Sequence, residues 1–200
     1  MGLLDGVTIM VVDTETTGFD PAKGDRLVEV ARVTIANGRA GETWSSLVHP
    51  GRAIPPDAAK IHGITDAMVA GAPRYAEVGR ALREQIGDHP IAFHNAPFDL
   101  PFLVHLFREA GAPPLVNPVL DTLGLARGLW GVGSNGLGAV AQKLGVTAGT
   151  AHRALGDATT TANVLLELVS RWEAKFATRS FAELAAESLD IMRKTSRPRR

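Results

Sequence analysis

Cysteine is absent from the 200 residues, so the chain forms no disulfide and offers no thiolate to a metal or to catalysis. Any metal site would therefore consist of oxygen and imidazole ligands. Excess charge of either sign is absent as well, because 21 Lys and Arg residues balance 21 Asp and Glu residues. Net charge thus indicates no particular partner, so a binding surface has to be sought in the local distribution of charge.

Long hydrophobic runs are also missing. The apolar stretch within the N-terminal MGLLDGVTIMVVD is too short to cross a membrane, and no basic residue precedes it. We therefore expect a cytoplasmic protein without a signal peptide or a membrane partner. The 45% of apolar residues still suffices for a hydrophobic core, and 200 residues correspond to one domain with a short extension.

The first fifty residues predict three strands, at about 7–14, 26–36 and 41–48. Asn37-Gly38 between the last two is typical of a hairpin, so these strands should form an antiparallel meander. Further along the chain, strands alternate with helices, an order typical of parallel strands. The pattern predicts an α/β fold with a mixed sheet flanked by helices. The later segments are strands at 90–95 and 118–123 and helices at 66–71, 75–87, 97–110, 136–145 and 154–172.

The pattern changes beyond residue 172. Ser180 and Glu183 form a capping box that predicts one further helix, and the chain ends in the basic sequence RKTSRPRR. We therefore predict a main domain at 1–172 and a C-terminal helix with a basic tail at 173–200, partly disordered.

Acidic residues and a histidine occur where predicted strands end or helices begin. Asp13 and Glu15 follow the apolar sequence IMVV, and alternation along a strand directs both to one side of the sheet. Asp99 lies at the helix start in HNAPFDLPFL, and His152 and Asp157 lie in HRALGD. The helix dipole alone accounts for a single Asp in a first turn. Two neighbouring carboxylates on a strand instead require a cation, a shared proton or open water.

These segments resemble the motifs of the DnaQ-like 3′-to-5′ exonucleases, whose signature is four acidic residues and a histidine. The family includes proofreading subunits of bacterial replicative DNA polymerases. VVDTETTG resembles its first motif, HNAPFDLPFL its second and HRALGD its third, and IHGIT, DTLGLAR and QKLGV are further similarities. Together they span about residues 7–170. The resemblance implies an RNase H-like fold, in which a five-stranded mixed sheet has helices on both sides.

The resemblance implies that Asp13, Glu15, Asp99 and Asp157 bind two Mg²⁺ or Mn²⁺ ions and that His152 is the general base. Carboxylates without cysteine suit such hard cations, and two of these ions can clamp a phosphodiester. His152 precedes Asp157 by five residues, which on one helix would place the two on different faces. We therefore expect His152 on the loop before the helix, where an imidazole can accept a proton from water.

Substrate contacts are also suggested by the resemblance. They would be made by Thr14, Thr16, Ile61, His62 and Phe98, of which the apolar side chains would stack on a terminal base. A turn-capping role for Thr16 and a helix-core role for Phe98 are equally good accounts.

Three features leave alternatives open. Asp121 either supports the cleft or forms a turn, and Arg153 either contacts a phosphate or is solvated. GVGSNG at 131–136 satisfies the G-x-G-x-x-G pattern of dinucleotide sites. The segment before it is a poor strand, so we interpret it as a connection into the next helix.

The sequence thus predicts a 3′-to-5′ exonuclease that hydrolyses phosphodiesters at DNA 3′ ends and releases nucleoside 5′-monophosphates, in proofreading or repair. An RNA-trimming exonuclease is the alternative, because the same residues serve both substrates. A non-catalytic nucleic-acid-binding domain is disfavoured, since it has no need to keep repelling carboxylates together. The expected partners are single-stranded DNA or RNA 3′ ends and a DNA polymerase subunit.

Overall fold

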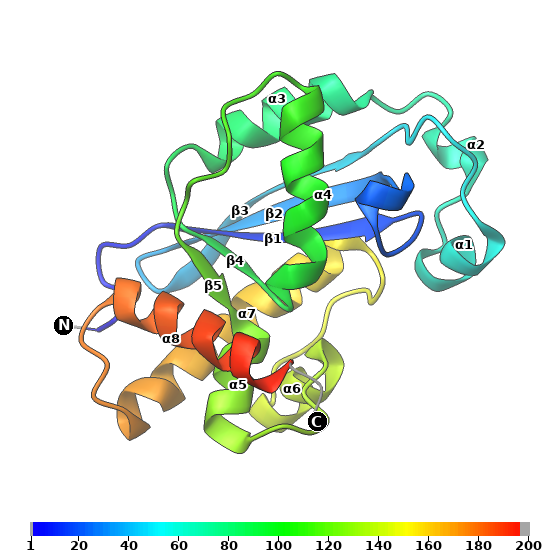
Figure 1. Cartoon of the computed structure of the whole chain (residues 1–200). Coiled ribbons are helices and arrows are strands. Elements are labelled where there is room, and N and C mark those ends of the chain that lie inside the picture. The colour runs from blue at the N-terminus through cyan, green and yellow to red at the C-terminus, as the bar shows by residue number, and fades with distance from the viewer. Residues whose placement is uncertain (1, 197–200) are drawn as a thin grey trace.

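The chain is built around a single five-stranded sheet in the order β3-β2-β1-β4-β5 (Figure 1). The computed structural model describes residues 2–196. β1, β2 and β3 pair antiparallel, whereas β4 pairs parallel with β1 and β5 pairs parallel with β4. The predicted mixed sheet, an antiparallel meander followed by parallel strands, is confirmed. The strands are β1 Ile9–Thr16, β2 Leu27–Ala36, β3 Arg39–Leu47, β4 Ile91–Phe93 and β5 Val119–Asp121.

Helices cover both faces of this sheet (Figure 1). They are η1 Pro21–Lys23, α1 Pro56–His62, α2 Asp66–Val69, α3 Tyr75–Ile86, α4 Ala96–Glu109, α5 Thr122–Trp130, α6 Leu137–Leu144, α7 Ala154–Lys175 and α8 Phe181–Thr195. Helices α3 and α4 pack on one face and α7 packs on the other. No helix within residues 2–196 combines the length and the apolar character needed to cross a membrane.

The central strand β1 divides the core into two parts. Its apolar run suits a strand that is covered on both faces. Ile9 and Val11 point toward α7, and Met10 and Val12 point toward α3 and α4. Because side chains alternate along a strand, the residues that follow Val12 are also divided between the two faces. The packing of the apolar part of β1 therefore determines the face toward which each charged side chain at its end points.

Helix α5 was not predicted from the sequence. The expected strand at 118–123 ends at Asp121 because the carboxylate of Asp121 accepts hydrogen bonds from the backbone N–H groups of Leu123 and Gly124. Asp121 is therefore an N-cap, and the helix begins with Thr122. GVGSNG follows this helix and connects α5 to α6, as interpreted from the sequence.

Helix α8 packs against the main body of the protein at α5 and β5. Its residues Leu184, Ser188 and Met192 are buried, and the Ser188 hydroxyl accepts a hydrogen bond of 3.0 Å from the backbone N–H of Asp121. Helix α7 continues to Lys175, so the boundary predicted after residue 172 falls within a helix. The division into 1–172 and 173–200 stays a prediction, and residues 197–200 of the expected disordered tail lie outside the described residues.

Candidate active site

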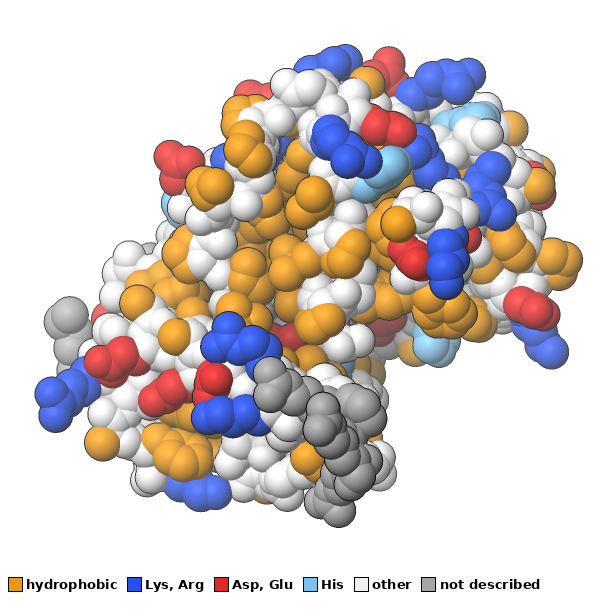
Figure 2. Space-filling model, viewed as in Figure 1, with side chains coloured by type: hydrophobic (Ala, Val, Ile, Leu, Met, Phe, Trp, Pro, Cys, Tyr) orange, Lys and Arg blue, Asp and Glu red, His pale blue; other side chains and the backbone are white. Residues whose placement is uncertain are grey.

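Three carboxylates converge at the end of β1 on the face covered by α7. Asp13 and Glu15 extend the row of side chains begun by Ile9 and Val11, and Asp157 reaches them from the first turn of α7. One carboxylate oxygen from each of Asp13, Glu15 and Asp157 lies within 4.8 Å of the others. The structure therefore brings together residues that are separated by more than 140 positions in the sequence. In the space-filling view, acidic side chains lie in a hollow between the parts of the molecule that contain α4 and α6 (Figure 2).

Asp99 is a fourth acidic group, and it approaches from the first turn of α4. Its side chain is 4% exposed. The Thr14 hydroxyl donates a hydrogen bond of 2.7 Å to Asp99 Oδ1. Asp99 lies outside the group of three but is near enough for its charge to raise the pKa of Asp13. The four predicted acidic ligands therefore surround one region, three of them tightly.

The pKa values of these carboxyl groups reflect their burial and mutual repulsion. Burial, followed by the charge of Asp99, raises the pKa of Asp13 well above its usual value. Burial, followed by the charge of Asp157, raises the pKa of Glu15 to about 8. Burial raises the pKa of Asp99 to about 7, against the opposing effect of the Thr14 hydrogen bond. Such a cluster is stabilised by protons or by a cation.

His152 lies on the loop before α7, as the sequence predicted. Its φ of 58° is in the left-handed region, which few non-glycine residues adopt. Its backbone N–H donates a hydrogen bond of 2.8 Å to Asp157 Oδ2. Its side chain is exposed. The imidazole is therefore open to solvent while its backbone is held by one of the clustered carboxylates.

Glu29 on β2 is a further acidic residue of this region, and the sequence analysis missed it. It lies opposite Glu15 in the β1–β2 register and is 5% exposed. Its carboxylate accepts hydrogen bonds from Arg153 Nε at 3.1 Å, from Arg153 Nη2 at 2.6 Å and from the Ala154 backbone N–H at 2.9 Å. Of the two roles considered for Arg153, phosphate contact and solvation, neither describes this ion pair. The sequence feature that could have identified Glu29 is a charged residue inside the apolar strand sequence LVEVARV.

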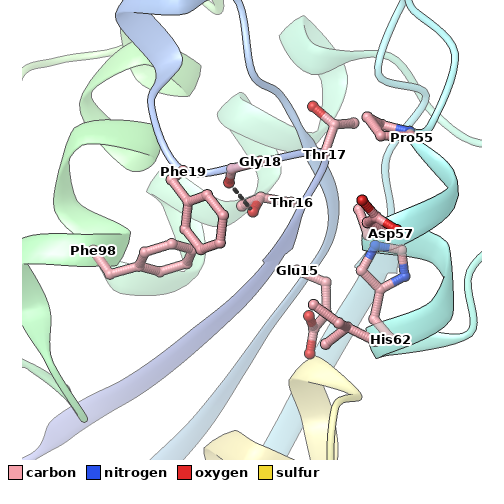
Figure 3. A pocket seen from close by; sticks show the side chains of 11 residues that line it. Glu15, Thr16, Thr17, Gly18, Phe19, Pro55, Asp57, His62 and Phe98 are labelled. Atoms are coloured by element: carbon pink, nitrogen blue, oxygen red, sulfur yellow. Dashed lines mark hydrogen bonds between the residues drawn. The ribbon is translucent and has the colours of Figure 1, made fainter.

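A pocket of about 400 Å³ opens beside Glu15 (Figure 3). Figure 3 shows Phe19 and Phe98 on one side of it and His62 of α1 on the other. The rings of Phe19 and Phe98 meet edge to face with centroids 6.3 Å apart. Ile61 also lines the pocket and is 57% exposed. The pocket is thus an apolar surface next to the acidic cluster.

Four of the five residues that the sequence predicted to contact substrate line this pocket. Thr16, Ile61, His62 and Phe98 line it, whereas Thr14 is directed to Asp99. The Thr16 hydroxyl donates to the Gly18 carbonyl at 2.6 Å, which agrees with the turn-capping account. Phe98 also packs on the core residue Phe102, as the helix-core role expects, and its contact with substrate stays a prediction. Phe19, which is 83% exposed, was not predicted, because an apolar residue in a turn sequence gives no periodic signal.

His62 presents a polar atom without a partner next to this pocket. Its side chain is buried, and Nδ1 accepts a hydrogen bond of 3.0 Å from the Ile64 backbone N–H. Nε2 therefore carries the proton of the neutral ring, and it has no hydrogen-bond partner within residues 2–196. Burial lowers the pKa of this imidazole. His62 thus lines the pocket with its Nε2–H group buried and unpaired within residues 2–196.

Asp121 supports the start of α4. It is completely buried, and its carboxylate accepts hydrogen bonds from the backbone N–H groups of Asn95 at 3.1 Å and Ala96 at 2.8 Å. These bonds fix the helix start that carries Asp99. Asp121 therefore supports the segment that carries Asp99, and it begins α5 where the other alternative expected a turn.

A mixed five-stranded sheet with acidic residues from β1, α4 and α7 at one end defines the class of nucleases with an RNase H-like fold. The family model described as Exonuclease matches residues 10–165 of this chain. The chain therefore belongs to the exonuclease family. The resemblance found in the sequence and the predicted RNase H-like fold are both confirmed.

Curated relatives and solved structures agree with this assignment. The chain is 44% identical over 177 residues to a DNA polymerase III subunit epsilon-like protein of Rhodobacter capsulatus, covering 86% of this chain and 25% of the relative. It is 34% identical over 183 residues to the DNA polymerase III subunit epsilon of Aquifex aeolicus, covering 91% and 90%. Exonuclease X in complex with 5′ overhanging duplex DNA has a TM-score of 0.71 at 29% identity, covering 90% of this chain and 99% of that chain.

Proposed function

We propose that this protein is a metal-dependent 3′-to-5′ exonuclease that hydrolyses phosphodiesters at single-stranded DNA 3′ ends and releases nucleoside 5′-monophosphates. The convergence of Asp13, Glu15 and Asp157 within 4.8 Å is the observation that carries the proposal. Membership of the exonuclease family supports the reaction. Relatives that are named as DNA polymerase III epsilon subunits support DNA as the substrate.

The acidic cluster fits a divalent cation. All its donors are carboxylate oxygens, which Mg²⁺ and Mn²⁺ prefer. Burial and mutual repulsion raise the pKa values of Asp13 and Glu15, so a bound cation would favour their ionised forms. Asp13, Glu15 and Asp157 would hold one ion, and Asp13 with Asp99 would contribute to a second. Bound ions of this kind polarise the phosphodiester and stabilise charge on the attacking and leaving oxygens.

His152 is proposed as the general base. A base must reach the water that it deprotonates, and the exposed ring of His152 is attached to a loop that contacts Asp157 through its backbone. A neutral imidazole accepts a proton from the attacking water and releases it to solvent afterwards. Its position at the edge of the acidic cluster, rather than inside it, leaves the ring free to do both.

The pocket beside Glu15 is proposed to receive the terminal nucleotide. Bases stack on apolar side chains, and Ile61 and Phe98 present such surface next to the carboxylates. His62 lines the same pocket and is proposed to contact the nucleotide. Thr16 contributes to the wall of the pocket, and Thr14 acts indirectly through Asp99.

Three further predictions accompany this proposal. An RNA end is the alternative substrate, because the residues that would perform hydrolysis act on the phosphodiester and not on the sugar. The names of the epsilon relatives support association with a DNA polymerase. A role in proofreading is the function we expect of such an association. A cytoplasmic location stays a prediction.

A time course on oligonucleotides of one sequence tests the proposal. DNA and RNA strands labelled at the 5′ or the 3′ end are incubated with Mg²⁺, with Mn²⁺ or with EDTA. We expect stepwise shortening from the 3′ end that stops in EDTA and in Asp13→Asn. The exposed Asp88→Asn is the matched control and should retain full activity. Shortening from the 5′ end, or activity that persists in EDTA, would contradict the proposal.

A further inference from the structure

Glu29 holds the loop that carries His152. We propose that Glu29 is a positioning residue, which acts through Arg153 and the Ala154 backbone to keep the His152 imidazole placed for general-base work. This inference rests on the proposed function, because it assigns a purpose to a residue within the same site. It concerns a contact between two segments that lie 124 positions apart in the sequence.

The contact is specific and comes from a rigid part of the protein. Glu29 is on β2, the strand between β1 and β3, and only 5% of it is exposed. Two nitrogens of one guanidinium and one backbone N–H converge on its carboxylate. Bidentate pairs of this kind fix the orientation of both partners as well as the distance between them. Glu29 therefore fixes the residue directly after His152 and also the first residue of α7.

The backbone at His152 needs such support. Left-handed φ values such as that of His152 are strained in non-glycine residues and persist only when the surroundings impose them. The Asp157 carboxylate holds the loop at the His152 N–H, and Glu29 holds it immediately afterwards. The loop also packs closely on the helix, since a Cβ atom at Gly156 would lie 2.1 Å from the Thr150 carbonyl oxygen. Removing one of the two carboxylate contacts would let the His152 backbone relax.

The charge of Glu29 explains why the arrangement includes an arginine. Glu29 lies opposite Glu15 on the same face of the sheet, so an unpaired carboxylate there would add to the repulsion in the acidic cluster. Arg153 neutralises it, and the pairing raises the pKa of the Arg153 guanidinium. Nε and Nη2 of Arg153 are used in this pair. Positioning is therefore the role that the contacts favour over direct phosphate binding.

Kinetics of Glu29→Gln, combined with His152→Ala, test the inference. Glu29→Gln keeps the shape of the side chain and removes its charge. We expect kcat on a single-stranded DNA substrate to fall about tenfold to a hundredfold while KM stays within about twofold, because misplaced catalytic groups lose rate rather than binding. In the His152→Ala background, measured at single turnover, adding Glu29→Gln should change the rate by no more than about twofold. Arg153→Lys should retain more activity than Arg153→Ala.

Two measurements that do not depend on activity complete the experiment. Amide hydrogen exchange in peptides that cover residues 149–156 should be about tenfold faster in Glu29→Gln than in the unmodified protein. The increase in melting temperature on adding Mn²⁺ should persist, since the metal ligands are intact. Glu42→Gln makes the same charge change on the adjacent strand β3, at a side chain that is 86% exposed, and should leave kcat and exchange unaltered.

Several results would overturn the inference. They are an unchanged kcat in Glu29→Gln, an equal loss with and without His152, and an effect confined to KM. The last would indicate that Arg153 binds substrate. If the unmodified protein releases no nucleotides at all, the proposed function fails, and the exchange rates alone then show whether Glu29 holds the loop.

Discussion

The Thr14 hydroxyl donates a hydrogen bond to the Asp99 carboxylate, and this contact lies on the face of the sheet that α4 covers. Thr14 points toward α4, whereas its neighbours Asp13 and Glu15 point toward α7. One strand thus places carboxylates on one face and, through a hydroxyl, orients a carboxylate on the other. The geometry of Asp99 is therefore linked to Thr14, which lies between the two β1 members of the acidic cluster, Asp13 and Glu15.

Replacing Thr14 tests this link. The Thr14 hydrogen bond lowers the pKa of Asp99, which burial raises. Thr14→Val keeps the shape and removes the donor, so the pKa of Asp99 should rise further and a divalent cation should bind more weakly. We expect the Mn²⁺ concentration for half-maximal activity to rise about tenfold, which corresponds to about 1.4 kcal/mol. Thr14→Ser restores the donor and should remain close to the unmodified protein. Equal Mn²⁺ dependence in Thr14→Val and Thr14→Ser would exclude the link.

Asp13→Asn should separate stability from activity. The substitution removes one of several repelling charges, so in EDTA at pH 8 the variant should melt at a higher temperature than the unmodified protein, by roughly 2–4 °C for each kcal/mol gained. Hydrolysis should be lost, and Mn²⁺ should no longer raise the melting temperature. Calorimetry with and without Mn²⁺ measures both effects. Destabilisation of the metal-free variant would show that the Asp13 carboxylate is a structural group instead.

The positions of the clustered acidic residues and of His152 were predictable because each lies in a short local motif. VVDTETTG, HNAPFDLPFL and HRALGD each place their key residues within a few positions of one another. Local spacing also predicted the loop position of His152, and strand alternation predicted that Asp13 and Glu15 share a face. The catalytic roles of these residues stay predictions.

Features that depend on register or on several segments were not predictable. Glu29 faces Glu15 only because β1 and β2 pair in one particular antiparallel register, and its partner Arg153 is distant in sequence. The pocket likewise combines the turn after β1, helix α1 and the start of α4. Helix α5 was missed for a different reason, since the apolar residues after Asp121 also suited the continuation of a strand.

His94 should make the stability of the folded protein depend on pH. The ring contacts the Thr122 hydroxyl and donates from Nε2 to the Asn135 carbonyl at 3.0 Å. Burial, with a smaller effect of Arg127, lowers its pKa from 6.5 to about 4. A histidine with a depressed pKa in the folded state stabilises the protein above pH 6.5 and loses that contribution as the pH falls toward 4, by up to about 3 kcal/mol.

Urea unfolding of the unmodified protein and of His94→Gln between pH 7 and pH 4 measures this contribution. The carboxyl groups of the site have raised pKa values and act in the opposite direction, but they are common to both proteins. The difference in unfolding free energy between the two proteins should therefore shrink steadily as the pH falls below 6.5. A constant difference across this range would show that His94 does not titrate with the expected shift.

The contact between Ser188 and Asp121 should make α8 part of the cooperative fold. Ser188 is completely buried, and it satisfies the Asp121 N–H on the edge strand of the sheet. Ser188→Ala leaves this donor without a partner and should cost about 1–3 kcal/mol of unfolding free energy. Gly124→Ala should cost more, because its Cβ atom would lie 2.1 Å from the Ser188 carbonyl oxygen and would push α8 away from α5.

Urea unfolding, followed by circular dichroism and by tryptophan fluorescence, measures these costs in a Trp44→Phe, Trp130→Phe background, where Trp172 is the remaining tryptophan. Trp172 lies near the end of α7, and its indole N–H donates to Thr178 in the segment that leads to α8. If α8 unfolds together with the sheet, both probes should give one transition that shifts to lower urea in the two variants. Gly138→Ala, which meets no atom within 4 Å, is the matched control for Gly124→Ala. A separate early transition seen by fluorescence would instead support the predicted division of the chain after residue 172.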